Sequence, residues 1–476
     1  MTIIVPANTL AAGGFDVDNS VRFNDGDSAY MHKTAAAGNR RTFTFSTWFK
    51  RGQLGTNQQL FNSYSAANAG GFAYMQLEAI ESGVVGDRIS LEVYGTILLK
   101  TTQVLRDPSS WYHLVIAVDT TSGTANNRCR MYLNGTEITN FVTRNNPDQN
   151  FDFAFNQNNI DMYLGSNNYG GNKGNYFDGY MAEVVWIDGT QYAASDFGEF
   201  DEDSNIWKPI DVSGLTFGTN GFYLDFKASG NLGNDANGGT DLTEVNLAAT
   251  DQSTDTCTNN FATLNPLHSI GAASELSQGN LEYDPAGHHR IISTIAPTSG
   301  KWYAEVKGID NPDKFNAGVA HYPMPANGSA SSFAFGQGVN ADVGRFANDF
   351  GVKANGDYGN SNSYSSYMAS LESENNNIVG IYLDLDNYKI YFSKNGTLVS
   401  STGKNLTNNG EPYGFISVGE AGTFQWNFGN PSFALANTAI TDDNGFGAFE
   451  YSPNITGDSA AKKFYALCTK NLAEFG

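Results

Sequence analysis

The stretch Thr42-Phe43-Thr44-Phe45-Ser46-Thr47-Trp48-Phe49 alternates polar and apolar side chains, as a half-buried β-strand does. Similar short runs occur at residues 89–91, 111–118, 129–133, 160–164 and 180–187. Gly, Asn and Asp separate these runs, and no segment between residues 20 and 226 keeps a helical period. Many short strands at this spacing predict an antiparallel β-sandwich or jelly roll.

The composition is also that of a turn-rich β-protein. Of the 476 residues, 40% are hydrophobic, 13% are aromatic and only 16% are charged, and 52 are glycine. One hydrophobic core rarely serves more than about 250 to 300 residues, so the length predicts two or three domains.

The formal net charge of −22 disfavours nucleic acid and anionic membrane surfaces as partners, because both would repel the chain. Arg40-Arg41 and Lys50-Arg51 are isolated basic pairs, which we expect at solvated strand ends. No apolar run reaches the roughly 20 residues of a membrane-spanning helix. The sequence therefore predicts no nucleic-acid binding and no membrane insertion.

The cysteines and the N-terminus indicate where the protein assembles. Cys129, Cys257 and Cys468 are odd in number and far apart, which predicts neither a metal site nor a disulfide framework and suits a reducing cytoplasm. Residues 1–10 lack the basic start and apolar core of a signal peptide. If the protein acts outside a cell, we expect that it did not use the usual export route.

Six motifs in the first half occur in the order typical of one domain family. They are Val21-Arg22-Phe23-Asn24-Asp25-Gly26, Phe45-Ser46-Thr47-Trp48, Trp111-Tyr112-His113-Leu114-Val115, Met131-Tyr132-Leu133-Asn134-Gly135, Leu164-Gly165 and Phe177-Asp178-Gly179-Tyr180-Met181. The Asn134-Gly135 pair in the fourth motif has a physical explanation, because Asn-Gly readily adopts the positive φ that a tight hairpin turn requires. Together the motifs resemble a laminin-G or pentraxin-type concanavalin-like domain, which the resemblance places at residues 13–228.

A second ordered set runs through residues 300–429. It includes Gly300-Lys301-Trp302-Tyr303-Ala304-Glu305-Val306, Ile378-Val379-Gly380-Ile381-Tyr382-Leu383-Asp384-Leu385-Asp386, Ile390-Tyr391-Phe392-Ser393-Lys394-Asn395-Gly396 and Asn427-Phe428-Gly429. This set resembles a SPRY domain, a β-sandwich used for binding, which we place at residues 274–436. The Ser/Asn/Tyr/Gly-rich stretch at 349–370 suggests an enlarged loop.

The predicted fold class is therefore all-β, with two tandem antiparallel β-sandwich domains of jelly-roll type joined by a Gly/Asn-rich connector at residues 229–273. Residues 1–12 are a separate N-terminal segment, and residues 437–476 are too few for an independent core, so we expect a packing or assembly segment there. The connector at 255–266 and the C-terminal ending are similar to segments of bacteriophage virion proteins.

Catalytic signatures are absent from the sequence, and we predict that the protein is not an enzyme. His113 lies inside a strand pattern and is expected to be structural. Glu183 and Asp188 are five residues apart, which favours opposite strand faces over a carboxylate pair for glycan hydrolysis. Asp384 and Asp386 share a strand face but are expected to border a turn.

Calcium is the one cofactor that the sequence suggests, because laminin-G and pentraxin relatives bind it through loop oxygens. Two acidic clusters are candidates, although neither has the full spacing of a calcium loop and no ligand set is assigned. They are Asp16, Asp18, Asp25 and Asp27, and Asp235, Asn237 and Asp241.

Two loops combine aromatic rings, which stack on sugar faces, with amide oxygens, which bind sugar hydroxyls. They span residues 167–176 and 357–367, and the alternative is that their tyrosines only cover the sandwich edge or a subunit contact. The predicted ligand-binding residues are Asn167, Asn168, Tyr169, Asn172, Tyr176, Tyr358, Asn360, Tyr364 and Tyr367.

The tandem binding folds and the phage-like segments imply a bacteriophage virion structural protein, a tail-fibre or adhesin component that recognises a host-surface glycan or protein. Such a protein would be assembled in the host cytoplasm, displayed on the virion surface and bound to other virion proteins, with a homo-trimer as the first guess. The alternatives are an architectural capsid decoration or head-fibre protein and a glycan depolymerase.

Overall fold

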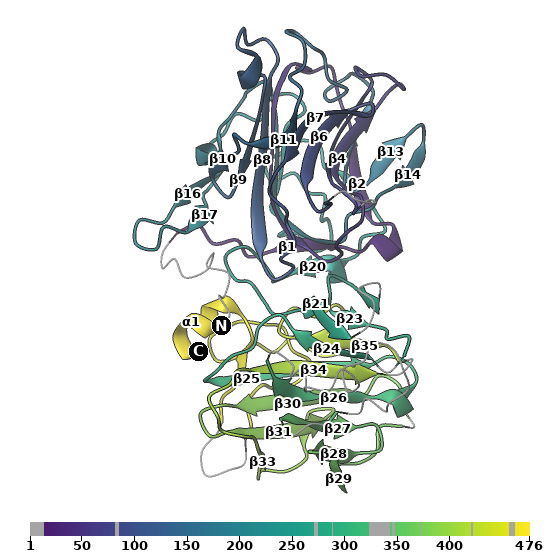
Figure 1. Ribbon diagram of the computed structural model, residues 1–476, viewed down its shortest axis with the longest axis vertical. Coiled ribbons are helices and arrows are strands. Elements are labelled where there is room, and N and C mark those ends of the chain that lie inside the picture. The colour runs from purple at the N-terminus through teal and green to yellow at the C-terminus, as the bar shows by residue number, and fades with distance from the viewer. Residues whose placement is uncertain are drawn as a thin grey trace. The chain divides into compact units, whose positions relative to one another are not determined.

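The computed structural model describes residues 14–80, 85–270, 275–287, 289–322, 343–344, 348–372, 374–419, 422–456 and 462–476. The described chain divides into two compact units between Thr258 and Asn259, inside the predicted connector (Figure 1). The predicted N-terminal segment 1–12 lies outside the described residues. Both units consist of antiparallel sheets, apart from the short parallel pairing of residues 465–466 with residues 302–303, and this confirms the all-β prediction. Among the described residues, no helix has the length and apolar character needed to cross a bilayer.

Two eight-stranded sheets, which we call sheet I and sheet II, form the N-terminal unit. Sheet I consists, in spatial order, of β10 (Thr136–Glu137), β9 (Cys129–Leu133), β8 (Trp111–Asp119), β3 (Thr42–Arg51), β15 (Gly179–Asp188), β1 (Ser20–Phe23) and β20 (Gln252–Ser253), with β18 (Phe222–Leu224) beside β15. Sheet II consists of β11 (Phe141–Arg144), β7 (Thr96–Thr101), β6 (Ile89–Val93), β5 (Phe72–Leu77), β4 (Gln58–Tyr64), β12 (Asp161–Leu164), β2 (Tyr30–Thr34) and β19 (Thr243–Val245).

Smaller elements complete this unit. They are the hairpins β13 (Asn167–Tyr169) with β14 (Asn172–Gly174) and β16 (Gly198–Phe200) with β17 (Trp207–Pro209), and the 3-10 helices η2 (Asp25–Asp27), η3 (Ala125–Asn127), η4 (Ala194–Asp196) and η5 (Ala249–Asp251).

The core of the N-terminal unit lies between sheets I and II. Phe43 of β3 stacks on Trp186 of β15 with ring centroids 5.0 Å apart, and Phe45 stacks on Phe61 of sheet II at 5.2 Å. All four rings are fully buried. The alternation seen at residues 42–49 thus places one set of aromatic rings in this core, as the sequence predicts.

The opposite face of sheet I is buried too, which the alternating pattern did not predict. Trp48, Trp111 and Tyr180 pack there against residues 192–223. Lys50 and Arg51 lie at the end of β3. The prediction that these two side chains are solvated is wrong, because both are only 1% exposed. Lys50 Nζ pairs with Asp255 at 2.8 Å, and Arg51 pairs with Asp87 at 2.9 Å. These carboxylates come from distant parts of the chain, so local sequence could not show that the cations are buried.

The C-terminal unit contains sheet III and sheet IV. Sheet III consists of β21 (Leu264–Ile270), β24 (His289–Ser293), β34 (Tyr413–Gly419), β26 (Asn316–His321), β27 (Asp349–Lys353), β28 (Asp357–Asn360) and β29 (Ser363–Ser366). Sheet IV consists of β22 (Leu276–Ser277), β23 (Glu282–Tyr283), β35 (Phe424–Asn427), β25 (Lys301–Gly308), β30 (Ile378–Asp384), β31 (Lys389–Lys394) and β32 (Thr397–Leu398), with β33 (Lys404–Asn405) beside β31 and β36 (Tyr465–Ala466) beside β25. One 3-10 helix, η7 (Pro312–Lys314), and one α-helix, α1 (Thr469–Phe475), accompany the sheets.

Trp302, Trp426 and Phe415 belong to the core between sheets III and IV. The prediction of an enlarged loop at residues 349–370 is wrong. Most of this stretch forms β27, β28 and β29, which extend sheet III. The Ser, Asn and Gly content of this stretch suggested a loop. In the structure only Ser361 and Asn362 have positive φ, which is enough for a two-residue turn, and the residues on either side of them remain extended.

The C-terminal residues pack on the outer face of sheet IV. Phe449, Phe464 and Ala466 are buried against Tyr303 and Tyr382 of that sheet. The buried carboxylate of Glu305 on β25 accepts bonds from the backbone N–H groups of Glu450 (3.0 Å) and Tyr451 (2.8 Å). The described part of residues 442–476 therefore obtains its buried surface from the second sandwich.

Candidate ligand-binding face of the N-terminal unit

Sheet II turns one face toward the core and the other, which we call the outer face, away from sheet I. Side chains alternate between faces along a strand. Phe61, Met75 and Leu91 occupy the core face. The register sets Asn62 opposite Tyr74, and Tyr74 opposite Glu92, so these side chains share the outer face.

Four aromatic rings gather on the outer face and form what we call the aromatic platform: Tyr64, Phe72, Tyr94 and Tyr169. The Tyr169 ring lies 5.2 Å from Tyr64, 5.3 Å from Phe72 and 6.5 Å from Tyr94, between ring centroids. A hydrogen bond with the Tyr94 hydroxyl raises the pKa of Tyr169. Tyr169 is 40% exposed and Tyr94 is 43% exposed, so a ligand can reach both rings.

A chain of polar side chains, which we call the polar ladder, crosses β4, β5 and β6 on the same face. Gln59 Nε2 donates to Gln76 Oε1 at 2.7 Å, and Gln76 Nε2 donates to Glu92 Oε1 at 2.9 Å. Glu92 also accepts bonds from Ser90 Oγ at 2.7 Å and from the Tyr74 hydroxyl at 2.6 Å. Burial and the bond to Glu92 raise the pKa of Tyr74. The ladder holds its amide groups in fixed orientations beside the platform.

Several buried polar atoms at this face have no hydrogen-bond partner among the described residues. Gln59 Oε1 and Asn62 Nδ2 belong to β4, and Ser166 Oγ and Asn167 Oδ1 lie where β12 leads into β13. Leaving such an atom unpaired costs about 1 to 3 kcal/mol, so native proteins usually supply a partner from protein, water or ligand. Acceptors and donors of this kind match the hydroxyl groups of a sugar.

The hairpin β13–β14 carries the predicted residues of the first loop and projects from the unit (Figure 1). The Asn168 N–H donates to Asn62 Oδ1 at 3.0 Å, and the Gly171 N–H donates to Asn168 Oδ1 at 3.2 Å. Asn168 is thus buried and holds the hairpin on β4, whereas Asn172 is exposed. Tyr176 follows the hairpin and stacks on Tyr30 at 6.4 Å.

Lys173 lies toward β12 and β2 on the same hairpin. Its Nζ is 4.3 Å from the centre of the Tyr163 ring and 5.9 Å from that of Tyr30. Partial burial lowers the pKa of Lys173. Asp161 accepts a bond from the Tyr163 hydroxyl at 2.9 Å. A second group of rings therefore continues the outer face beyond the platform.

The second predicted loop has a different environment. Tyr358 is 9% exposed, and its ring lies 5.7 Å from that of Tyr367 and 6.4 Å from that of Phe392. Asn360 Nδ2 donates to the backbone oxygen of Asp349 at 3.1 Å. The structure places Tyr358 and Asn360 on β28, Tyr364 on β29 and Tyr367 just after β29. Tyr358 and Tyr367 mainly pack against the C-terminal core.

The carboxylates considered for catalysis do not meet. Glu183 lies in a bulge of β15 and accepts a bond from the Tyr223 hydroxyl at 2.6 Å. Asp188 accepts bonds from the Asn39 N–H at 2.7 Å and from Asn156 Nδ2 at 3.1 Å. Each carboxylate thus has its own set of partners.

His113 is a buried structural residue. Trp207 Nε1 donates to His113 Nδ1 at 3.0 Å, which leaves the proton on Nε2, 2.9 Å from Ser46 Oγ. Burial lowers the pKa of His113 to about 3, so the ring is neutral at physiological pH.

The acidic clusters suggested for calcium mostly bind the chain itself. Asp235 Oδ1 accepts the N–H groups of Tyr223 and Asn237, each at 3.0 Å, and Asp241 Oδ1 accepts the N–H of Asp235. Asp27 accepts a bond from Asn24 Nδ2 at 2.8 Å. Among the described residues, no group of three or more His, Cys, Asp or Glu is arranged to hold a metal ion. Calcium binding stays a prediction.

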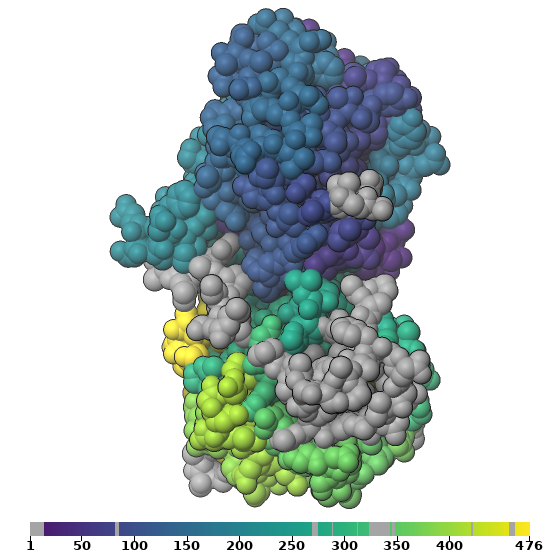
Figure 2. All heavy atoms as spheres, viewed as in Figure 1, coloured from purple at the N-terminus to yellow at the C-terminus, as the bar shows by residue number. Residues whose placement is uncertain are grey.

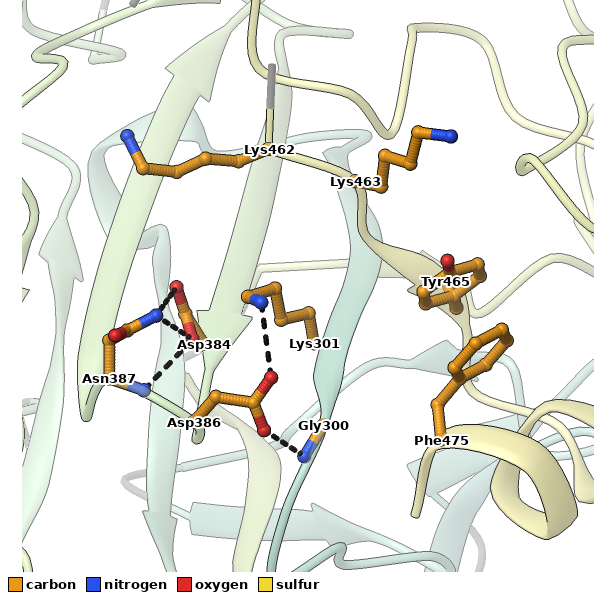
Figure 3. Close-up of a pocket in the computed structure, with 9 residues that line it drawn as sticks. All are labelled: Gly300, Lys301, Asp384, Asp386, Asn387, Lys462, Lys463, Tyr465 and Phe475. Carbon is orange, nitrogen blue, oxygen red and sulfur yellow. Dashed lines mark hydrogen bonds and ion pairs between the residues drawn. The ribbon is translucent and has the colours of Figure 1, made fainter. Parts of the chain in front are cut away.

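A cavity of about 390 Å³ opens on the C-terminal unit (Figure 3). In its lining, Lys301 Nζ lies 3.1 Å from Asp386, and the buried Asp384 accepts bonds from the backbone and side chain of Asn387. Tyr465 and Phe475 stack at one side with centroids 3.8 Å apart. Asp384 and Asp386 border the turn after β30, as the sequence predicts.

Residues 24–194 match the family model of the concanavalin A-like lectin/glucanases superfamily, of laminin-G type. The laminin-G and concanavalin-like prediction for the first module is confirmed. No curated protein matches the chain.

Three solved structures illustrate the likeness. A candidate carbohydrate-binding protein from Bacteroides ovatus is 15% identical over 48% of this chain and 58% of its own length, with a TM-score of 0.33. The heptameric SAP-like pentraxin of Limulus polyphemus is 13% identical over 38% of this chain and 80% of its own, with a TM-score of 0.30. The SPRY domain of human HERC1 is 12% identical over 34% of this chain and 96% of its own, with a TM-score of 0.24.

Proposed function

We propose that the N-terminal unit binds a glycan on the outer face of sheet II. The observation that carries this proposal is the exposed aromatic platform beside the polar ladder. The rings would stack on the apolar face of a sugar, and the exposed amide of Asn172, which pairs with Tyr169 across the hairpin, would bind its hydroxyl groups. The concanavalin A-like family match supports a lectin function for the same unit.

The test is a glycan array probed with the full chain, followed by calorimetric titration with the strongest hit. Tyr169→Ala removes the central ring of the platform, and we expect it to weaken binding by about 1 kcal/mol, roughly fivefold. Phe200→Ala is the matched control, because Phe200 is 45% exposed in the same unit but lies on β16, outside sheet II. Equal affinities for wild type and Tyr169→Ala would remove the outer face from consideration.

A reducing-end assay on the same glycan separates binding from cleavage. Glu92 is the buried carboxylate of the polar ladder, and it accepts hydrogen bonds from Tyr74, Gln76 and Ser90. Incubating the bound glycan with the protein and assaying for new reducing ends distinguishes a lectin from a depolymerase. We expect no reducing ends, because a glycosidase needs a second carboxyl about 5 to 9.5 Å away and Glu92 belongs to a hydrogen-bonded network instead.

We further infer that this recognition serves a bacteriophage virion, as a tail-fibre or adhesin component. The phage-like connector and ending of the sequence support this context, as does the tandem arrangement of two β-sandwiches. The alternative is an architectural decoration of the capsid. Immunogold labelling of virions separates the two, since an adhesin predicts label at the tail and a decoration predicts label over the shell.

A further inference from the structure

The hairpin β13–β14 presents different side chains on its two faces. Gly170-Gly171 forms its two-residue turn, with φ of 62° and 91°, which glycine adopts readily. Tyr169 pairs with Asn172, and Lys173 pairs with Asn168. Paired residues share a face of a ribbon and neighbours alternate, so Tyr169 and Lys173 lie on opposite faces. Figure 2 shows the blue-teal atoms of this hairpin standing out from the surface at the right of the N-terminal unit, where Figure 1 labels β13 and β14.

Tyr169 and Lys173 therefore contact two different groups of rings on the outer face of sheet II. Tyr169 belongs to the aromatic platform. Lys173 lies over a second set, which we call the ring group: Tyr30, His32, Tyr163 and Tyr176. The register sets Tyr163 opposite His32 on one side and opposite Asn62 on the other, so the ring group shares the outer face with the platform.

Part of the ring group is accessible to a ligand. Tyr30 and Tyr176 are half-buried, and their rings stack 6.4 Å apart. The His32 side chain is 28% exposed and stacks on Tyr163, which is itself only 5% exposed. A sugar can therefore reach Tyr30 and Tyr176, while Tyr163 supports the group from the sheet.

A cation and a carboxylate accompany these rings. Lys173 Nζ lies 4.3 Å from the centre of the Tyr163 ring. The Asp161 side chain is 31% exposed, and its carboxylate accepts bonds from the hydroxyl groups of Thr34 at 2.5 Å and Tyr163 at 2.9 Å. A carboxylate can accept about four hydrogen bonds and an ammonium group donates three, so both have capacity for a ligand.

We propose that the ring group, together with Lys173 and Asp161, is a second sugar-binding site, separate from the aromatic platform. This inference rests on the proposed glycan binding by the N-terminal unit. Tyr30 and Tyr176 stack on the apolar face of the sugar. Lys173 supplies a donor and Asp161 an acceptor, which together match a hydroxyl group that both donates and accepts.

The charges of the site favour an uncharged sugar over an acidic one. Lys173 and Asp161 have opposite charges, so the pair has no net attraction for an anion. The whole chain has a formal net charge of −22 and repels anionic glycans. The platform and the ring group can therefore bind residues of the same neutral glycan class, one on each side of the hairpin.

Calorimetric titration of the full chain with uncharged disaccharides tests the proposal. The probes are cellobiose, lactose, maltose and N,N′-diacetylchitobiose, and cellobiouronic acid differs from cellobiose only by its carboxylate. We expect two molecules of the best-binding disaccharide per chain. If cellobiose binds, we expect cellobiouronic acid to bind more weakly. Equal or tighter binding of the acid would contradict the assignment to uncharged sugars.

Single substitutions assign each bound disaccharide to one side of the hairpin. Tyr176→Ala should weaken one of the two sites about fivefold and leave the other unchanged, and Tyr169→Ala should do the reverse. In the double variant the two effects should add, because independent sites do not couple. Phe200→Ala, which lies outside sheet II, should alter neither site.

Lys173→Met removes the donor and keeps the length of the side chain, so it should weaken the same site as Tyr176→Ala, about tenfold. Lys227→Met is the matched control, because it removes the same charge from an exposed position outside sheet II. Circular dichroism and melting curves check that each variant is folded.

The possible outcomes separate this site from the proposed function. One bound disaccharide per chain, lost in Tyr169→Ala and retained in a folded Tyr176→Ala, overturns the second site and leaves glycan binding at the platform in place. Two sites that both persist unchanged in Tyr176→Ala and Lys173→Met also overturn it. If no glycan of the array or of this series binds, the proposed function and the second site fall together.

Discussion

Glu183 shows how one buried side chain can couple folding to pH. It is 6% exposed, its φ is 50°, and its carboxylate accepts a hydrogen bond from the Tyr223 hydroxyl. Burial raises its pKa from the ordinary value of 4.5 to about 7. The folded state therefore holds a proton that the unfolded chain releases. This contribution to stability is complete below pH 4.5 and is lost as the pH rises to about 7.

Glu183→Gln should remove this pH dependence. The amide oxygen can still accept the Tyr223 bond, and the side chain never becomes charged. Relative to wild type, the variant is expected to gain stability between pH 4.5 and 7, reaching a difference of about 3 kcal/mol at pH 8 compared with pH 4. Urea denaturation at a series of pH values measures it. The exposed Glu202→Gln is the control, and parallel curves for Glu183→Gln and wild type would contradict the expectation.

The sequence could indicate residue types for the site but not the strand residues that complete it. Tyr169 was predicted because it lies in an Asn/Gly-rich stretch. Tyr74 and Glu92 were missed, because Phe72-Ala73-Tyr74-Met75 is apolar on both faces and its pattern cannot say which face meets solvent. Only the register of β5 with β6 shows that these residues share a face.

At the scale of elements, a hydrogen bond from β4 contributes to holding the hairpin β13–β14 on sheet II. Asn62→Ala leaves the buried Asn168 N–H without its acceptor, which costs about 1 to 3 kcal/mol locally. We expect faster amide exchange at Asn168 and Tyr169 and weaker glycan binding, because Tyr169 is no longer held over Tyr64 and Phe72. Hydrogen exchange by mass spectrometry measures the first effect and calorimetry the second.

Gln59→Ala is the companion variant, since it shortens the polar ladder on the same strand and leaves the Asn62 to Asn168 bond in place. It should weaken glycan binding without changing exchange in the hairpin. Unchanged exchange in Asn62→Ala would show that other contacts hold the hairpin.

Turn chemistry made several elements predictable. Asn134-Gly135 and Asn395-Gly396 both adopt positive φ and join β9 to β10 and β31 to β32. A Cβ on Gly135 would lie 2.2 Å from the Trp207 ring, a contact that only the fold reveals. Ser361-Asn362 makes the same kind of turn, but its composition is that of a loop, so β28 and β29 could not be predicted.

For the whole molecule, length and composition predicted two or three β-rich domains, because one hydrophobic core rarely serves so long a chain, and the ordered motifs reduced this to two β-sandwiches. They could not predict that residues 243–245 and 252–253 add β19 and β20 to the first unit, since these strands are three and two residues long and have no pattern of their own. These two segments become strands only because they pair with β2 and β1, respectively.

The two cores should unfold separately. Phe61 lies in the core of the N-terminal unit, and Phe415 lies beside Phe428 in that of the C-terminal unit, with ring centroids 5.8 Å apart. Phe61→Ala and Phe415→Ala each leave a buried cavity, at a cost of about 3 to 5 kcal/mol. Because the long-range contacts divide at Thr258 and Asn259, we expect each variant to lower one calorimetric transition and to leave the other in place. Hydrogen exchange at β3 and β25 assigns the transitions, and a single transition lowered by both variants would show that the units fold as one.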